Sequence, residues 1–181
     1  MDVDYGPLTG LIGSWKGDKG MDVAPEPDGS EESPYWETID FEAIGDVTNA
    51  EQQTLTVLRY QQIVRRKSND EVFHDQTGYW MWDAGSQTVA HSLAIPRAVA
   101  LVAGGRYAGG SGPVVLEVAA KAGAANWGIA QSPFMSDNAK TVEFRYRATI
   151  EGDRLHYAET TVVDIYGRTF DHTDENELTR V

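Results

Sequence analysis

Four histidines are the side chains of this sequence best suited to bind a metal or to transfer a proton near neutral pH, and there is no cysteine. The histidines are His74, His91, His156 and His172. None lies three or four residues from another, so spacing alone indicates no helical pair of zinc ligands. The lack of cysteine excludes disulfides, thiolate metal sites and a cysteine nucleophile. A metal site at these histidines would need ligands brought together from separate segments.

Other catalytic patterns are not found in the sequence. No Gly-x-Ser-x-Gly turn presents a serine nucleophile, and spacing identifies no carboxylate pair as a glycosidase site. The pairs Gly104-Gly105 and Gly109-Gly110 lack the Lys-Ser or Lys-Thr of a phosphate-binding loop. No motif therefore supports a catalytic role by itself. For His91 we expect a half-buried, hydrogen-bonded position, and for His156 a place facing the lumen or solvent.

Most of the chain shows patterns typical of β-strands. Residues 35–43 and 54–65 alternate between two faces, and short β-branched and aromatic runs follow them. Further strands are predicted over residues 72–83, 87–95, 98–104, 113–121, 140–150 and 154–164, with a last one around 175–181. Compact polar turns of hairpin type separate several of these runs.

One short helix is predicted within residues 5–14, where Leu8, Leu11 and Ile12 repeat at helical spacing. Strands joined in sequence favour an all-β, lipocalin-like, up-and-down antiparallel β-barrel of about ten strands, with this helix as a short N-terminal plug. A two-sheet sandwich with Greek-key links is the alternative. A parallel α/β fold is not supported, because no predicted helix is long enough for its crossovers. We expect one domain over residues 1–181.

The charge of the chain restricts its partners. It has 28 acidic and 15 basic side chains, for a formal net charge of −13. A nucleic-acid binder needs clustered Lys and Arg, and an anionic membrane surface attracts basic segments, so we expect neither partner. The acidic N-terminus does not resemble a signal peptide, and we expect a cytoplasmic protein. A homodimer stays open as an assembly state.

Acidic residues concentrate in one segment of the chain. Residues 22–46 contain nine acidic side chains, no basic one, and the prolines Pro25, Pro27 and Pro34. Charge runs of this kind are typical of solvated segments. We therefore expect a mobile loop on the rim of the barrel. The pattern of a Ca²⁺-binding loop is absent from it.

Two stretches carry more specific information. Gly13-Ser14-Trp15 opens the first strand, where glycine lets the chain leave the short helix and tryptophan can plug the closed end, burying up to about 250 Å². The second stretch, residues 72–82, contains His74 and is dense in aromatic side chains. Barrels of this kind hold one small molecule in their interior. A small-molecule ligand in the barrel cavity is therefore the expected partner.

Several aromatic and basic side chains could line such a cavity. The aromatic ones could equally form ordinary core, which is the favoured interpretation for Tyr79, Trp80, Trp82, Trp127 and Phe134. The strand arginines could point inward and receive a carboxylate, but alternation does not decide which of them do so. They are Arg59, Arg65, Arg145 and Arg147.

These stretches, taken in order, resemble the nitrobindin family, the fatty-acid-binding-protein-like haem-binding β-barrels. The matching elements span nearly the whole chain. They are Gly13-Ser14-Trp15-Lys16-Gly17, Tyr60-Gln61-Gln62, His74-Asp75-Gln76-Thr77-Gly78-Tyr79-Trp80, Gly104-Gly105, Leu155-His156-Tyr157, and His172 before Leu178.

The resemblance implies a ten-stranded barrel that holds haem b at its mouth. His172 matches the proximal iron ligand, directly before the last strand, and His74 matches the histidine that lines the distal side without ligating. Family members bind nitric oxide, and some isomerise peroxynitrite to nitrate, so peroxynitrite isomerase is the enzyme activity that the resemblance implies. A single histidine ligand leaves the sixth iron position open.

The chain also departs from the family pattern. After His172 it is acidic where apolar residues are usual, and Asp171, directly before it, could orient the imidazole as a hydrogen-bond acceptor. The alternative function is a haem-free, lipocalin-like binding module for a small apolar or amphipathic carboxylate. A haem titration of wild type and His172→Ala separates the two functions.

Overall fold

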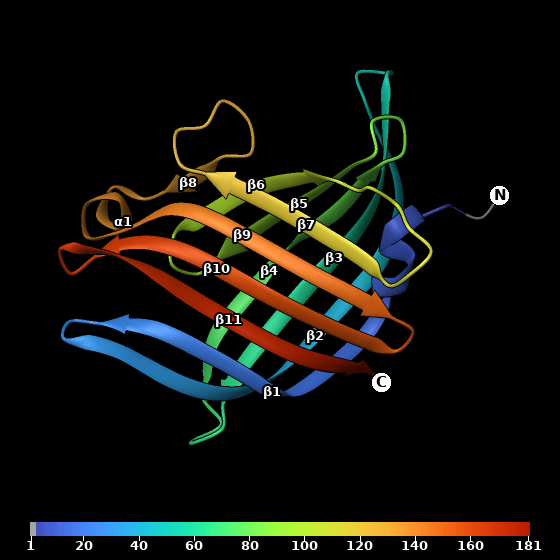
Figure 1. Ribbon diagram of the computed structural model, residues 1–181. Helices are drawn as coiled ribbons and strands as arrows, with labels where there is room; N and C mark the ends of the chain where they lie inside the picture. The colour runs from blue at the N-terminus through green and yellow to red at the C-terminus, as the bar shows by residue number, and fades with distance from the viewer. Residues whose placement is uncertain (1–2) are drawn as a thin grey trace.

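Ten antiparallel strands close into a barrel in the computed structural model, which describes residues 3–181 (Figure 1). The barrel strands are β1 (Gly13–Glu26), β2 (Gly29–Asn49), β3 (Gln53–Arg66), β4 (Val72–Asp83), β5 (Thr88–Ile95), β6 (Val99–Arg106), β7 (Val114–Lys121), β9 (Ala139–Glu151), β10 (Arg154–Ile165) and β11 (Arg168–Arg180). A short strand, β8 (Ile129–Gln131), pairs with β6.

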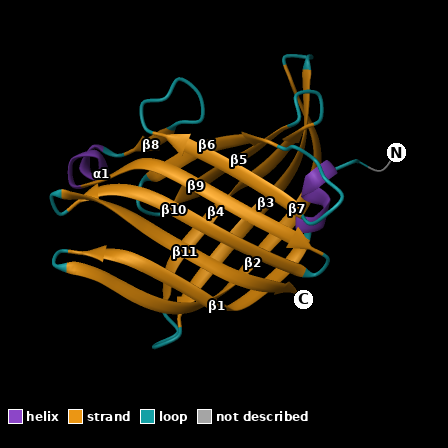
Figure 2. Cartoon of the chain, viewed as in Figure 1, coloured by secondary structure: helices purple, strands orange, loops and turns teal. Residues whose placement is uncertain are grey.

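The order of the strands confirms the predicted up-and-down barrel. Each barrel strand pairs with the next one along the chain, with β7 pairing with β9, and β1 pairs with β11 to close the circle. Figure 2 shows strands through most of the chain and helix only in the 3₁₀ helix η1 (Gly6–Leu11) and in α1 (Pro133–Asn138). Neither helix has the length and apolar character that crossing a membrane requires.

The predicted N-terminal plug is confirmed at one end of the barrel. Leu8 and Leu11 of η1 are buried, and Trp15, at the start of β1, is fully buried. The Trp15 indole Nε1 donates a hydrogen bond to the Leu11 carbonyl at 2.7 Å. The Arg180 guanidinium lies 4.2 Å from the centre of the Trp15 ring and donates to the carbonyl of Gly10. Helix, tryptophan and arginine together close this end.

The acidic segment 22–46 is not a loop, and that prediction is wrong. It lies in the long β1–β2 hairpin, which is paired without interruption from Gly20–Tyr35 to Glu26–Gly29. Pro25 and Pro34 are tolerated because they lie beyond the ladders with β11 and β3, where each strand has a neighbour on one side only. Alternation directs most of the acidic side chains outward, so their charge is compatible with a strand.

The last strand also begins earlier than predicted. β11 pairs with β10 from Arg168–Ile165 onward, so His172 lies inside the last strand and not before it. The sequence of β11 has only two buried positions, which hides the strand from a hydrophobic pattern. The unpredicted α1 begins after Ser132, whose Oγ accepts a hydrogen bond from the Met135 N–H at 3.3 Å. Figure 1 shows α1 at the opposite end of the barrel from η1.

Candidate functional site

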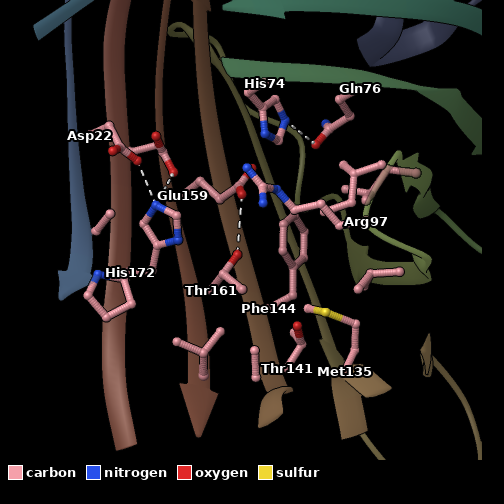
Figure 3. A pocket seen from close by; sticks show the side chains of 18 of the residues that line it. Asp22, His74, Gln76, Arg97, Met135, Thr141, Phe144, Glu159, Thr161 and His172 are labelled. Carbon is pink, nitrogen blue, oxygen red and sulfur yellow. Dashed lines mark hydrogen bonds and ion pairs between the residues drawn. The ribbon is translucent and has the colours of Figure 1, made fainter. Parts of the chain in front are cut away.

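A cavity of about 290 Å³ lies at the end of the barrel away from the plug, and both His172 and His74 line it. One part of its wall is apolar, including Phe73, Leu93, Leu101, Phe144 and Val163. Met135 of α1 also lines it, so the unpredicted helix forms part of its rim. Figure 3 shows the polar and apolar side chains converging on this space.

The two histidines approach the cavity from well-separated walls. His172 is on β11 and His74 on β4. Around the barrel, β1, β2 and β3 separate these strands on one side, and five strands separate them on the other. The structure therefore brings together the two histidines that the sequence singled out.

Three carboxylates lie beside His172 because of the strand register. Asp22 of β1 and Glu159 of β10 are each paired directly with Asp174 of β11. Asp174 is two residues from His172, so alternation places both on the same face of β11. Sequence reasoning missed all three carboxylates. A predicted last strand that began before His172 would have placed His172 and Asp174 on the same face. Asp22 reaches the site only because β1 pairs with β11 and closes the barrel.

His172 makes a short hydrogen bond to Asp22. Its Nε2 lies 2.6 Å from Asp22 Oδ1 and 3.6 Å from Asp174 Oδ2. The Nδ1 atom has no hydrogen-bond partner among residues 3–181. The side chain of His172 is 31% exposed, whereas that of Asp22 is 6% exposed. A histidine with one nitrogen bonded to a carboxylate and the other free is the usual arrangement of a metal-ligating imidazole.

The neighbouring Asp171 does not orient His172, contrary to the sequence-based interpretation. Its carboxylate lies 3.7 Å from Arg145 and is exposed. Adjacent residues of a strand point to opposite faces, which places Asp171 outside the barrel when His172 points inward. The carboxylate partner of His172 is therefore Asp22.

Two of the carboxyl groups near His172, those of Glu159 and Asp174, have raised pKa values. Burial raises the pKa of Glu159 to about 7, although the nearby His172 opposes this effect. Burial, with the charges of Glu159 and Asp22, raises the pKa of Asp174 well above its ordinary value. Both side chains are half-buried, and their remaining exposed surface faces the cavity. Ligand atoms of Asp22, His172 and Asp174 lie within 4.8 Å of one another, so this end of the cavity favours a positively charged centre.

His74 is the outer end of a chain of buried hydrogen bonds. Its Nε2 lies 3.2 Å from Gln76 Oε1, and Gln76 Nε2 donates to the Tyr60 hydroxyl at 2.6 Å. The Tyr60 hydroxyl lies 2.8 Å from His91 Nε2. Burial lowers the pKa of His74, so its imidazole is neutral at pH 7. Since Gln76 Oε1 is an acceptor, the single N–H of His74 is directed to Gln76 and its Nδ1 is unprotonated.

The other two histidines lie outside the cavity. His91 is fully buried, and not half-buried as expected, because it stacks on Trp80 with ring centres 4.1 Å apart. Its Nδ1 has no hydrogen-bond partner, and burial lowers its pKa to about 3. His156 is exposed. Neither lines the cavity, although His91 is the inner end of the hydrogen-bond chain that begins at His74.

The arginines of the cavity are not those identified from the sequence. Arg59, Arg145 and Arg147 form ion pairs with acidic side chains outside the cavity, and Arg65 lies near Asp70 and Trp36. The cavity is instead lined by Arg66 and Arg97. Figure 3 shows Arg97 reaching into the cavity near His74. Its charge lowers the pKa of His74, which also indicates that the two groups are close.

The core interpretation is correct for Trp80 and Trp82 and wrong for Tyr79, Trp127 and Phe134. Trp80 and Trp82 are buried in the core, whereas Tyr79, Trp127 and Phe134 are exposed. None of the five lines the cavity that contains His172. The aromatic contribution to that cavity comes from Phe73 and Phe144.

Comparisons with known proteins agree with this architecture. The sequence matches the family described as "THAP4-like, heme-binding beta-barrel domain" over residues 4–180. Among solved structures, Rv2717c from M. tuberculosis superposes with a TM-score of 0.72 at 22% sequence identity, covering 99% of each chain. A likeness at this identity shows a shared fold. No curated protein sequence matches the chain.

The family match covers nearly all of the described barrel, including both cavity histidines. It also agrees with the resemblance to nitrobindin-type barrels that the ordered sequence elements indicated. The chain therefore belongs to the THAP4-like, heme-binding β-barrel domain family.

Proposed function

We propose that this protein binds haem b in the cavity at the open end of the barrel, with His172 as the proximal iron ligand and His74 on the distal wall. The observation that carries the proposal is the state of His172. It lines a partly apolar cavity opposite His74, and the Asp22 carboxylate lies 2.6 Å from its Nε2. Histidine is a common proximal ligand of haem iron, and a carboxylate partner is common for a ligating histidine.

The residues around the cavity fit a haem group in their chemistry. Apolar side chains on β4, β5, β6, β9 and β10 provide surface for a macrocycle. The volume of about 290 Å³ is just below the range of roughly 300–1,000 Å³ found for small-molecule sites, and the cavity is open at its rim. Arg97, which is exposed at this rim, can meet a carboxylate group through charged hydrogen bonds.

The distal wall supports a small ligand such as nitric oxide or peroxynitrite. A haem held by one histidine supplies an open sixth coordination position. On the protein side, His74 is neutral and its N–H is held by Gln76, so it presents an unprotonated nitrogen. Arg97 is a cation near His74 that can stabilise an oxyanion. We infer that His74 and the apolar side chains confine the ligand. Arg97 contributes more to the binding of peroxynitrite, which is an anion, than to the binding of nitric oxide.

A titration with ferric haem tests the proposal. Wild type should give a saturable Soret shift at one haem per chain, and His172→Ala should abolish it or change its position. His156→Ala is the matched control because His156 is exposed and outside the cavity. The haem proposal fails if wild type gives no defined Soret shift, or if His172→Ala binds in the same way as His156→Ala.

A second experiment addresses the ligand of the haem-bound protein. Nitric oxide binding is measured from the Soret shift, and peroxynitrite decay is followed by stopped-flow absorbance. Arg97→Gln should slow peroxynitrite decay while it leaves nitric oxide binding close to wild type. Unchanged peroxynitrite decay would show that Arg97 has no part in oxyanion binding, and wild-type protein without acceleration would exclude the isomerase activity.

The second candidate function is a haem-free binding module for an amphipathic carboxylate. It is favoured by the combination of apolar wall and exposed Arg97 at the rim of one cavity. Displacement of a fluorescent fatty acid from wild type and from Arg97→Gln measures it. If the protein is a haem-free binding module, wild type binds the fatty acid and Arg97→Gln binds it more weakly. Haem then gives no Soret shift with wild type.

A further inference from the structure

Two buried amide side chains connect His74 at the cavity to Glu37 inside the barrel. We propose that Glu37 is a positioning residue for His74: through Gln62 and Gln76 it fixes the imidazole proton on Nε2 and leaves Nδ1 as a hydrogen-bond acceptor toward the cavity. This tautomer is a property of the protein without haem. Its consequence for a haem ligand rests on the proposed haem function.

The direction of the chain is fixed at its inner end by the backbone. Asn176 Oδ1 accepts hydrogen bonds from the N–H groups of Lys19 at 3.1 Å and Glu177 at 2.8 Å. The Asn176 Nδ2 is therefore the end that donates to Glu37 Oε1, at 2.8 Å. Glu37 is fully buried, and as a carboxylate it can only accept. Its Oε2 accepts from Gln62 Nε2 at 2.6 Å.

The next two amides carry this direction to the cavity. Because Glu37 holds Gln62 Nε2, Gln62 turns its Oε1 toward Gln76, whose Nε2 lies 3.5 Å away. Gln62 and Gln76 are buried and are direct partners in the β3–β4 ladder. Gln76 Oε1 is then directed to His74 Nε2 at 3.2 Å, the contact drawn in Figure 3. A neutral imidazole has one N–H, so the proton of His74 lies on Nε2.

The state of His91 indicates that this direction is imposed from outside the core. Gln76 Nε2 donates to the Tyr60 hydroxyl at 2.6 Å, which leaves the hydroxyl proton for His91 Nε2 at 2.8 Å. The proton of His91 is then on Nδ1, which is buried and has no hydrogen-bond partner. The opposite direction would leave His91 with no unpaired N–H. An unpaired buried donor is unfavourable, so a stronger preference elsewhere must select this direction, and the Glu37 carboxylate supplies it.

The tautomer determines which hydrogen bond the distal wall offers. His74 lines the cavity, and its Nδ1 has no hydrogen-bond partner among residues 3–181 and, unlike His91 Nδ1, is not enclosed. This nitrogen can accept a hydrogen bond from a ligand but cannot donate one. An oxyanion in the cavity therefore finds its donor in Arg97 and not in His74.

A competing explanation is that Arg97 selects the tautomer from the cavity side. Figure 3 shows its guanidinium near His74, and a cation there disfavours an N–H at Nδ1. Arg97→Gln removes this charge and leaves the buried chain intact, whereas changes at Glu37 or Gln62 alter the chain and leave the charge. The two explanations therefore predict opposite results in these variants.

Glu37→Gln tests the proposal because it inverts the chain while keeping the shape of the side chain. Asn176 still directs its Nδ2 to position 37, so the new amide places its oxygen there and its nitrogen toward Gln62. Gln62 and Gln76 then turn over, and the single imidazole proton of His74 moves through solvent from Nε2 to Nδ1. Long-range ¹H–¹⁵N NMR of the full chain without haem identifies the protonated nitrogen. The measurement is made at pH 8, where Glu37, with its pKa of about 7, is ionised.

Wild type should carry the His74 proton on Nε2 and Glu37→Gln should carry it on Nδ1, with the signals assigned by their loss in His74→Gln. Glu32→Gln, which removes an exposed carboxylate from the same strand, and Arg97→Gln should keep the wild-type pattern. Gln62→Met cuts the chain and should give a mixture of both tautomers, so it tests the proposal even if Glu37→Gln does not fold. A wild-type pattern in Glu37→Gln or in Gln62→Met, or a proton moved by Arg97→Gln, would overturn the role of Glu37.

Infrared spectroscopy of the carbon monoxide complex of the ferrous haem protein tests the consequence for a ligand. An N–H directed at bound carbon monoxide lowers its C–O stretching frequency, so Glu37→Gln should give a lower frequency than wild type and Glu32→Gln the same one. If wild type binds no haem, the proposed function fails while the NMR result on Glu37 stands. If the tautomer changes and the C–O frequency does not, the place of His74 beside the ligand is refuted and the role of Glu37 is retained.

Discussion

Substitution of Glu37 by glutamine should remove a large part of the pH dependence of folding. Glu37 is fully buried in β2, where its Oε2 accepts a hydrogen bond from Gln62 at 2.6 Å and its Oε1 accepts one from Asn176 at 2.8 Å. Burial raises its pKa from the ordinary value of 4.5 to about 7. The hydrogen bonds oppose this rise and do not cancel it.

The sign follows from proton binding in the two states. Between pH 4.5 and 7 the folded protein keeps the Glu37 proton, whereas the unfolded chain releases it. The free energy of unfolding therefore falls as the pH rises through this range and levels off above the folded pKa. At 1.36 kcal/mol per pH unit, a difference of about 2.5 units corresponds to about 3 kcal/mol. Glutamine has no proton to lose, so the variant lacks this contribution.

Urea unfolding at about pH 4.5 and pH 8 measures the effect. The free energy of unfolding of wild type should fall between these pH values by about 3 kcal/mol more than that of Glu37→Gln. Glu159, whose pKa burial also raises, is present in both proteins, so the difference isolates Glu37. Glu32→Gln, at an exposed position of the same strand, should behave as wild type. Equal pH dependence in wild type and Glu37→Gln would refute the reasoning.

Three further predictions concern the plug, the buried chain and the rim. Trp15→Ala removes the fully buried side chain that closes the barrel and should lower the free energy of unfolding by about 3–5 kcal/mol in urea titrations; a loss below 1 kcal/mol would show that the plug is not structurally important. Tyr60→Phe leaves the buried His91 Nε2 without its partner and should destabilise the fold by about 1–3 kcal/mol, and a neutral effect on thermal unfolding would contradict the hydrogen-bond chain. Arg97→Ala removes an exposed cation at the rim and should weaken haem binding by at most about fivefold, because exposed charge pairs contribute about 0–1 kcal/mol; a loss comparable to that of His172→Ala would mean that Arg97 has a larger role.

The barrel was predictable because its inward positions repeat with period two. On β3, the buried Leu58 and Tyr60 flank the exposed Arg59, and on β4 the buried Trp80 and Trp82 flank the more exposed Met81, which is the signal that a strand leaves in a sequence. Trp15 after a glycine also indicated its place at the closed end. Local patterns of this kind determine where strands lie and which face is buried.

The acidic hairpin was only partly predictable from the same signals: residues 35–43 alternate and were predicted as a strand, whereas the rest of the hairpin was not. Charge and proline in residues 22–46 indicate a solvated loop, yet pairing between β1 and β2 overrides this local preference. The outward side chains tolerate charge because they face solvent. Asp22 and Glu37, which face inward, are indistinguishable in sequence from their exposed neighbours.

The candidate site was predictable only in its histidines. His74 and His172 were found because they stand in a recognisable order of motifs, and the structure places both on one cavity. Asp22 and Glu159 reach this cavity through ladders between distant strands, which sequence spacing does not reveal. Arg97 lies in a turn after β5, where no alternation indicates the direction of a side chain.

A crystal structure of the protein with haem tests the proposed function most directly. We predict haem in the cavity at the open end, with His172 as the residue that holds the iron and His74 on the opposite wall. Haem bound elsewhere, or iron coordinated by His74 or by no histidine, would contradict it.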